Sequence, residues 1–390
     1  MNRTLLRIFP VLPALVSVAV LTGCREDEVV MPAEYETIPG TPAPDTSLQG
    51  MYLLNEGNMG SNKCTIDYYD FHTGVYARNF YSERNPDVIK ELGDVGNDIA
   101  VYGSKLYAVI NCSHKVEVMD ARSGRRIGQI DIPNCRYITF HEGNAYVSSY
   151  VGPVMVDPDS PKGAVYRVDT TSLAVTGRVT VGYQPEEMAV SGNTLYVVNS
   201  GGYRPPEYAN TVSAIDLGEF RQTGQIPGEI NMHRIRRDSE GKFWVTSRGD
   251  RQTRPSCLLV MDDRDGDGEI ELTDILPVPC SNIAIHGDRL YYISSEYSDY
   301  TGTSTVGYGV IDTRTKEVIS TNFITDGTER QITMPYGLAV HPETGDIYLT
   351  DAKNYVSSGT LYCFSPEGKK KWSIRTGDIP ASICFLPVAR

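Results

Sequence analysis

A carboxylate-rich stretch, DRDGDGEIELTD, runs from Asp263 to Asp274 and has the spacing of a calcium-binding loop. Such loops place carboxylates at positions 1, 3 and 5, a glycine at position 6 for the sharp turn, and a closing carboxylate at position 12. The predicted ligands are Asp263, Asp265, Asp267, the backbone carbonyl of Glu269, and Asp274, where aspartate replaces the usual glutamate. Close carboxylates repel one another unless a cation neutralises them, so we expect bound calcium. The alternative is an acidic, solvated hairpin without metal.

This loop lies inside a repeated pattern of short β-strands. An aromatic-containing strand recurs as MYLLNEG, KLYAVIN, NAYVSSY, TLYVVNS, KFWVTSR, RLYYISS and DIYLTDA. A second strand follows each of these, and six of the seven second strands end in an aspartate suited to capping a turn: Asp70, Asp120, Asp169, Asp216, Asp262 and Asp312. Another apolar strand precedes most copies, which gives four strands per unit. Such a repeat is typical of a β-propeller.

We therefore predict an all-β fold, a seven-bladed β-propeller, as one domain over residues 49–390. Counted from Met51, the first unit lacks its inner strand, and PASICFLP (Pro380–Pro387) has no strands after it. The C-terminal strand is expected to join the first blade, which closes the ring and removes both exposed sheet edges. The calcium-like loop then connects strands three and four of blade five, on the face of tight turns, so the calcium is expected to be structural.

The opposite face of this propeller collects long polar loops, and we expect the ligand site there because rigid blades can present variable loops. The 25 tyrosines, against 9 phenylalanines, also suit a wet binding surface. The expected binding residues are amides, tyrosines, charged groups and histidines of this face: Asn55, Glu56, Asn97, Asn111, His114, Arg136, Tyr150, Glu186, Asn199, Tyr203, His233, Arg248, Tyr297, Tyr336 and Tyr355. Each of them, taken alone, also fits a solvated loop or turn residue.

The sequence argues against catalysis and against nucleic-acid binding. Only His114 and His233 of the six histidines map near the long-loop face, and there is no spaced Ser/His/Asp set or H-x-x-H pair. The formal net charge of −13 is unsuited to a phosphate backbone. A lactonase-like enzyme with a metal in the central channel stays open, because inner strands begin with Asn97–Asp98, Glu186–Glu187, Asn231 and Asn282.

The N-terminus has the features of an export signal. A basic segment, MNRTLLR, precedes the apolar run IFPVLPALVSVAV and then LTGC, which matches a bacterial lipobox. We predict a lipoprotein signal peptide over residues 1–23, and a lipidated Cys24 followed by a flexible tether over residues 24–48. The alternative is an ordinary signal peptide with a chance cysteine. Cys257 and Cys280 flank the calcium-like loop and either pair across a hairpin or are buried thiols.

Several stretches resemble a known family. MYLLNEGNMGSNKC, ELGDVGNDIAVYGSKLYAVINCSHKVEVMD, IPNCRYITF and VGYQPEEMAV…LYVVNSGGYRPPEY are similar to the BtuG-type cobalamin-capturing surface lipoproteins of Bacteroidota, within the YncE-like "surface layer protein" propellers. The resemblance covers essentially Met51 to the C-terminus. Acidic Glu26, Asp27 and Glu28 after Cys24 resemble the surface-export signal of such lipoproteins.

The resemblance implies a non-enzymatic protein of the outer membrane and cell surface, anchored through its lipid alone. It implies binding of vitamin B12 and other corrinoids as ligands, and their transfer to a TonB-dependent transporter on which the propeller sits as a lid. A corrin ring edged with amides needs complementary amide, carboxylate and tyrosine groups. The alternatives are the metal-dependent lactonase-like hydrolase and a protein- or glycan-binding surface propeller.

Overall fold

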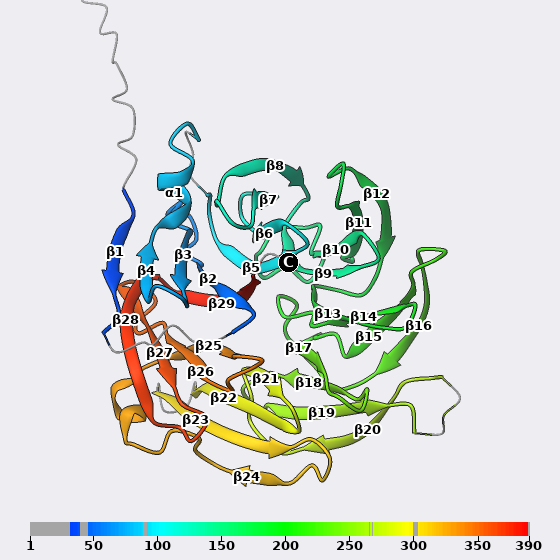
Figure 1. The fold of residues 1–390 in the computed structure, drawn as a ribbon. Helices are drawn as coiled ribbons and strands as arrows, with labels where there is room; N and C mark the ends of the chain where they lie inside the picture. The colour runs from blue at the N-terminus through cyan, green and yellow to red at the C-terminus, as the bar shows by residue number, and fades with distance from the viewer. Residues whose placement is uncertain are drawn as a thin grey trace, which may run out of the picture.

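The computed structural model describes residues 32–39, 46–88, 92–264, 266, 268–298 and 303–388. Its strands form seven antiparallel sheets around a central axis (Figure 1), one sheet of five strands and six sheets of four. The predicted all-β, seven-bladed propeller is confirmed. Helical structure in the described ranges is limited to α1 (Phe80–Arg84) and the 3-10 helix η1 (Thr328–Gln331).

Each blade is built from strands that pair in order from the central axis outward. Blade one contains β29 (Pro380–Pro387), β2 (Leu48–Asn55), β3 (Thr65–Asp70), β4 (Val75–Arg78) and β1 (Glu34–Thr37). Blade two contains β5 (Gly96–Tyr102), β6 (Lys105–Ile110), β7 (Lys115–Asp120) and β8 (Arg126–Asp131). Blade three contains β9 (Cys135–His141), β10 (Asn144–Ser149), β11 (Ala164–Asp169) and β12 (Val175–Thr180). Blade four contains β13 (Pro185–Ser191), β14 (Thr194–Asn199), β15 (Thr211–Asp216) and β16 (Arg221–Pro227).

Blades five to seven complete the ring with the same strand order. Blade five contains β17 (Met232–Arg237), β18 (Phe243–Ser247), β19 (Cys257–Asp262) and β20 (Glu271–Leu276). Blade six contains β21 (Asn282–His286), β22 (Arg289–Ser298), β23 (Thr303–Asp312) and β24 (Val318–Ser320). Blade seven contains β25 (Pro335–Val340), β26 (Ile347–Asp351), β27 (Ser358–Phe364) and β28 (Lys370–Asp378).

The ring closes as the sequence predicts. The last strand, β29, pairs antiparallel with β2, with Met51 opposite Phe385 and Leu53 opposite Ile383. In Figure 1 the red C-terminal strand lies beside the blue β2 in the inner position of blade one. Consecutive inner strands contact one another around the whole axis, from β5 to β29 and back to β5. The pairing of β29 with β2 thus gives blade one the inner strand that the first part of the chain lacks.

The hydrophobic core is divided among the interfaces between blades. Seven clusters of buried side chains are present in the described chain, and each spans two neighbouring blades. One cluster joins Met51 and Tyr69 of blade one to Tyr348 and Trp372 of blade seven, so it seals the ring at its closure. The packing of blade on blade thus fixes the rigid frame from which the loops extend.

Turns on one face are held by the aspartates that end the third strands. The Oδ1 atoms of Asp70, Asp120, Asp169 and Asp312 each accept hydrogen bonds from the backbone N–H groups two and three residues further on, and Asp216 accepts one from Glu219. This confirms the capping role expected from the repeat for these five of the six aspartates. A carboxylate there satisfies turn N–H groups that the sheet leaves unpaired.

Two expectations about local structure need correction. Residues 34–37 of the predicted tether form β1, which extends blade one by pairing with β4, Tyr35 opposite Ala77. The four residues of β1 are all exposed, and the free edge of the four-residue β4 favours this added strand. One of the expected long polar loops, between the second and third strands of blade six, is short, because β22 extends to Ser298 and β23 begins at Thr303.

The cysteines of the described chain are thiols rather than disulfides. Cys257 and Cys280 are both buried and are not bonded to each other, so the pairing considered across the hairpin is not formed. Burial raises the pKa of the Cys135 thiol to about 12, which keeps that thiol protonated and unreactive. The signal peptide and Cys24 lie outside the described residues. Within the described ranges, no helix has the length and apolar character needed to cross a membrane.

Candidate ligand-binding site

The inner strands carry irregular pairing at their first residues, on the face of the long loops. Six of the seven show a register shift there, namely β5, β9, β13, β17, β25 and β29. In β13, for example, Pro185 pairs with Asn199 and Met188 with Val197, which leaves Glu186 and Glu187 outside the ladder. A bulge at a strand end redirects side chains and is common beside binding sites. Here the repeated bulges gather polar side chains around the mouth of the channel.

Glu186 is the centre of this polar cluster and is fully buried. Its Oε1 accepts hydrogen bonds from the Tyr150 hydroxyl at 2.7 Å and from Ser200 Oγ at 3.1 Å. Arg136 Nη2 lies 3.4 Å from Oε2, and Arg248 Nη1 lies 3.6 Å from Oε1. The Arg136 guanidinium also lies 4.7 Å from the centre of the Tyr150 ring. Glu186 therefore orients two arginines and a tyrosine from three other loops and strands.

Glu187 forms a second buried ionic group beside the first. Arg234 Nη1 lies 2.6 Å from its Oε1, Arg236 also pairs with it, and the Ile235 backbone N–H donates at 3.1 Å. Burial acts to raise the pKa of Glu187, but Arg236 and Arg234 outweigh it and hold the pKa below its ordinary value. Glu187 is thus an anion at neutral pH, committed to two arginines of β17.

His233 and Tyr137 connect blades five and three. The Tyr137 hydroxyl lies 2.7 Å from His233 Nε2, and both side chains are buried. Burial, followed by the charges of Arg248, Arg234 and Arg136, holds the pKa of His233 well below its ordinary value. His233 is therefore neutral at physiological pH, and it serves as a polar contact rather than a cation.

Glu56 and two tyrosines form the side of the site contributed by blades one and seven. The Tyr336 hydroxyl lies 3.0 Å and 3.1 Å from the two carboxylate oxygens of Glu56. Burial raises the pKa of Glu56 to about 7, against the opposing effect of the Tyr336 hydrogen bond. The Tyr355 ring lies edge-on to Tyr336 at 5.7 Å between centroids. This part of the site offers aromatic surface and a carboxyl group that titrates near neutrality.

Four predicted amides have structural roles. Asn111 and Asn97 donate their amide hydrogens to backbone carbonyls of Cys135 and Arg136, in the neighbouring blade. Asn55 donates to Thr65, and Asn199 accepts from Gly182 while donating to Ser213. All four are buried, so they hold blades and links together instead of facing a ligand: Asn55, Asn97, Asn111 and Asn199.

The remaining predicted residues differ in their surroundings. His114 is exposed, and its Nδ1 accepts a hydrogen bond from the Asn134 backbone N–H at 3.1 Å. The Tyr203 ring packs edge-on to Tyr150 at 5.9 Å. The side chain of Tyr297 lies outside the described part of the structure. The structure therefore brings together the residues predicted on the bulged strands and their neighbouring loops: Glu56, Arg136, Tyr150, Glu186, Tyr203, His233, Arg248, Tyr336 and Tyr355.

The sequence prediction missed Arg236, which pairs with Glu187, and two residues that stand next to predicted ones, Tyr137 and Arg234. Each of these two follows a predicted residue directly, Arg136 in one case and His233 in the other. A comparison of equivalent positions would have found them, since polar pairs also stand at the starts of β5 (Asn97, Asp98) and β13 (Glu186, Glu187). The pairing of Arg234 with Glu187 across blades could not be read from the repeat.

A cavity of about 730 Å³ lies beside this cluster, over blades five to seven. Its lining comes from bulged inner strands, from the β18–β19 loop and from the blade-seven loop: His233, Arg234, Arg248, Arg251, Gln252, Arg254, Pro255, Ser256, Cys280, Ser281, Ser295, Thr305, Met334, Pro335, Tyr336 and Tyr355. Four predicted binding residues line it. The volume falls within the range of small-molecule sites, about 300–1,000 Å³.

Glu186 and Glu187 at the channel mouth are poorly suited to a divalent metal. Glu186 and Glu187 already contact four arginines between them, whose positive charges would oppose a cation. Asn282 donates to the backbone carbonyl of Tyr336, and Asn231 to that of Gly249. Among the described residues, no group of three or more His, Cys, Asp or Glu side chains is placed to hold a metal ion.

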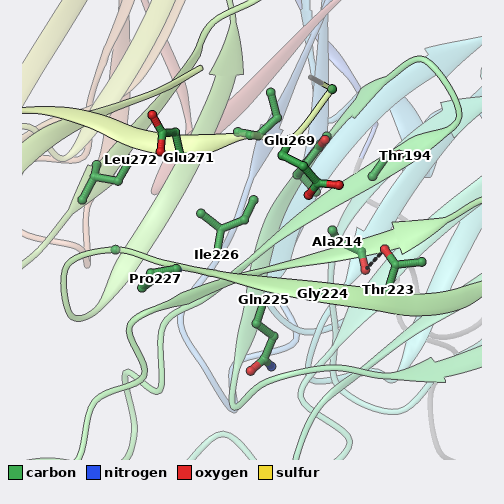
Figure 2. A pocket seen from close by; sticks show the side chains of 14 residues that line it. Thr194, Ala214, Thr223, Gly224, Gln225, Ile226, Pro227, Glu269, Glu271 and Leu272 are labelled. Carbon is green, nitrogen blue, oxygen red and sulfur yellow. Dashed lines mark hydrogen bonds between the residues drawn. The ribbon is translucent and has the colours of Figure 1, made fainter. Parts of the chain in front are cut away.

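The calcium-like hairpin lies at the outer edge of blade five, between β19 and β20. Its arm from Gly268 to Leu272 packs toward blade four and encloses, with β15 and β16, a cavity of about 540 Å³. Figure 2 shows Glu269, Glu271 and Leu272 on one side of this cavity and Ile226 and Ala214 on the other. Leu272 and Ile226 pack on one hydrophobic cluster, so the hairpin stiffens the interface between the two blades.

The loop carboxylates fit a cation site in part. Asp263 Oδ2 accepts a hydrogen bond from the Gly268 backbone N–H at 3.0 Å, and its Oδ1 is buried without a partner among the described atoms. Asp274 stands in β20 and pairs with Lys316 of blade six. The closing carboxylate of the loop is therefore engaged elsewhere. Asp265 and Asp267, the other two predicted ligands, lie outside the described residues.

Known structures share the propeller architecture at low sequence identity. Hydrazine synthase of Kuenenia stuttgartiensis matches with 15% identity and a TM-score of 0.59, over 74% of this chain and 89% of that chain. A quinonprotein alcohol dehydrogenase-like protein from Bacteroides thetaiotaomicron matches with 14% identity and a TM-score of 0.57, over 87% and 78%.

A hypothetical selenium-binding protein from Sulfolobus tokodaii matches with 11% identity and a TM-score of 0.57, over 87% of this chain and 93% of that chain. These likenesses establish the fold alone, because folds host unrelated functions. No curated protein matches the sequence. A family model described as "Domain of unknown function (DUF5074)" matches residues 49–385, nearly the whole propeller, and the chain therefore belongs to the DUF5074 family.

Proposed function

We propose that this protein is a non-enzymatic, surface-exposed lipoprotein that binds corrinoids such as vitamin B12 on the long-loop face. The observation that carries the proposal is the polar cluster around Glu186 and Glu187, set beside a cavity of about 730 Å³. The stretches resembling BtuG-type proteins lie in the first four blades, and Arg136, Tyr150 and Glu186 of the cluster fall within or beside them.

The chemistry of the site suits such a ligand. A corrinoid has a broad ring with apolar faces and a rim of amides, which can donate and accept hydrogen bonds. Tyr336 and Tyr355 provide aromatic surface on one side of the cavity, while Arg248 and His233 provide polar contacts on another. Because bulged strands and ion pairs fix these groups, a ligand would meet a preorganised surface.

The rest of the proposal follows from the N-terminus and the family resemblance. Cys24 would carry the lipid that anchors the chain to the outer membrane, and the propeller would pass its ligand to a TonB-dependent transporter. Calcium would act as a structural ion in the blade-five hairpin. Asp263, Asp265, Asp267 and the Glu269 carbonyl would hold it there, with Asp274 releasing Lys316 to join them.

Titration of the purified protein with cyanocobalamin tests the proposal. We expect saturable one-to-one binding, which Glu186→Gln weakens because Arg136, Arg248 and Tyr150 lose their common anchor. His72→Gln, in an exposed turn of blade one, should leave binding unchanged. An absence of binding at micromolar cyanocobalamin would reject the proposal.

A lactonase-like hydrolase is the competing function from another class. The arginines paired with the channel carboxylates oppose it, since they occupy the groups that a catalytic metal would need. Metal analysis of the variant Asp263→Ala/Asp265→Ala distinguishes the two functions. A tightly held metal in that variant, together with turnover of a lactone, would favour the enzyme.

A further inference from the structure

The cavity beside the polar cluster is strongly basic in a chain that is acidic overall. Four arginines line it, Arg234, Arg248, Arg251 and Arg254, and its lining includes no aspartate or glutamate. The whole chain, in contrast, has a formal net charge of −13. Positive charge concentrated at one concave place is the arrangement that attracts an anionic ligand.

The arginines differ in how far they are already neutralised. Arg234 is paired with Glu187, with Nη1 2.6 Å from the carboxylate, and Arg248 lies 3.6 Å from Glu186. Arg254 is 3.9 Å from Glu229 with 59% of its side chain exposed, so this contact is weak. Arg251 forms no ion pair or hydrogen bond with any described residue. Two guanidinium groups at the cavity rim are therefore available to a ligand.

The loop that carries these two arginines contains a turn that is held by hydrogen bonds to a carboxylate. The Asp250 carboxylate accepts hydrogen bonds from the backbone N–H groups of Gln252, Thr253 and Arg254 at 2.8–2.9 Å. Arg251 has a φ of 61°, in the left-handed region. The only carboxylate of this loop thus hydrogen-bonds to the loop backbone and forms an ion pair with neither arginine.

Arg251 and Arg254 are set to read a negatively charged group. A guanidinium fork makes paired hydrogen bonds to phosphate or carboxylate oxygens, which a lysine cannot reproduce. A divalent cation would be repelled by the same lining. The tyrosines Tyr336 and Tyr355, which line the same cavity from blade seven, offer rings against which a planar group beside the anion can pack.

We propose that Arg251 and Arg254 bind the phosphate of the ligand, so that the cavity receives the nucleotide loop of a corrinoid. This inference rests on the proposed function. The phosphodiester of that loop is the group of a cobalamin that carries a negative charge. The corrin ring would then lie over the mouth of the channel, where Arg136 is partly exposed beside the buried Tyr150 and Glu186.

The test compares cyanocobalamin with dicyanocobinamide, which keeps the corrin ring and lacks the nucleotide and its phosphate. Full-length protein in detergent is titrated as wild type, as Arg251→Gln/Arg254→Gln, and as Arg221→Gln, an exposed arginine of β16 with a nearby glutamate. We expect the double variant to lose affinity for cyanocobalamin by about tenfold for each arginine and to bind cobinamide as before. Arg221→Gln should bind both ligands like the wild type.

Equal losses for both corrinoids, or no loss for either, would overturn the assignment of the arginines while leaving corrinoid binding intact. A second arm uses inorganic phosphate and acetate as probes of thermal stability. We expect phosphate to raise the melting temperature of the wild type more than acetate does, and to have no such effect on the double variant. If neither corrinoid binds, the proposed function fails, and this arm alone decides whether the cavity takes a phosphate. A phosphate effect that survives in the double variant would count against it.

Discussion

The Tyr137 hydroxyl lies 2.7 Å from Nε2 of His233, and this contact joins blade three directly to blade five. Blade four, which separates them in the ring, contributes Glu186 and Glu187 to the same cluster. Polar side chains at the channel mouth thus connect three blades, in addition to the hydrophobic clusters at the interfaces between blades. The Nε atoms of Arg136 and Arg234 have no hydrogen-bond partner among the described residues, but the paired groups of this buried network hold its members in one arrangement.

Acid should weaken the fold through His233. Its pKa is held well below the ordinary value, so the folded protein does not bind the proton that the unfolded chain takes up below about pH 6.5. The stability contributed by the neutral histidine is therefore present above that pH and is lost as the pH falls. His233→Gln should reduce the slope with which the free energy of unfolding falls between pH 7 and pH 5, by up to about 1.4 kcal/mol per pH unit. Urea unfolding at both pH values measures this.

Glu56 should affect the pH dependence of stability in the direction opposite to His233, so it provides an internal check. Burial raises its pKa to about 7, so its contribution is fully present below about pH 4.5 and is lost as the pH rises through 7. Glu56→Gln should therefore make the acid-induced loss steeper, while His72→Gln in an exposed turn should leave it unchanged. If the unfolding free energy of His233→Gln depends on pH as steeply as that of the wild type, His233 is not the source of the acid-induced loss.

Removal of the Glu186 charge should be costly. Glu186→Gln keeps the size of the side chain but leaves Arg136 and Arg248 without their buried anion, which typically costs about 3–5 kcal/mol. The matched control is Glu207→Gln, because Glu207 pairs with Arg204 at 3.5 Å with 77% of its side chain exposed. We expect about 0–1 kcal/mol there. Similar free energies of unfolding for the two variants would show that the Glu186 cluster does not stabilise the channel mouth.

The number of blades and the ring closure could be predicted because they depend on local patterns. Alternating strands, turn aspartates such as Asp120 and the unpartnered strand at Pro380–Pro387 are visible in the chain itself. The amides were harder to assign, since Asn55 at a strand end serves a ligand and a neighbouring strand equally well. Only packing shows that it faces Thr65. The bulges that place Glu187 near Arg234 depend on contacts between blades, which the repeat does not specify.

The strand β1 should contribute to stability although the sequence suggests a tether. Ile38 directly follows it, is 4% exposed and packs into the cluster that seals the ring. Ile38→Ala should therefore destabilise the propeller by about 2–5 kcal/mol. Ile127 is the matched control because 49% of its surface is exposed, and Ile127→Ala should change stability by less than about 0.5 kcal/mol. If both variants unfold at the same denaturant concentration, the segment before Leu48 is dispensable.

Calcium should stabilise the fold without changing ligand affinity. At a free concentration about 100 times its Kd, an ion that binds only the folded state adds about 2.7 kcal/mol to the free energy of unfolding. Asp263→Ala and Asp265→Ala should each abolish the difference in melting temperature between calcium and chelator. Asp169→Ala removes a turn carboxylate of blade three and should lower stability equally in both conditions. Because the hairpin lies on the outer edge between blades four and five, cyanocobalamin binding should persist in all three variants. If the melting temperature of the wild type is the same in calcium and in chelator, DRDGDGEIELTD is an acidic hairpin without metal.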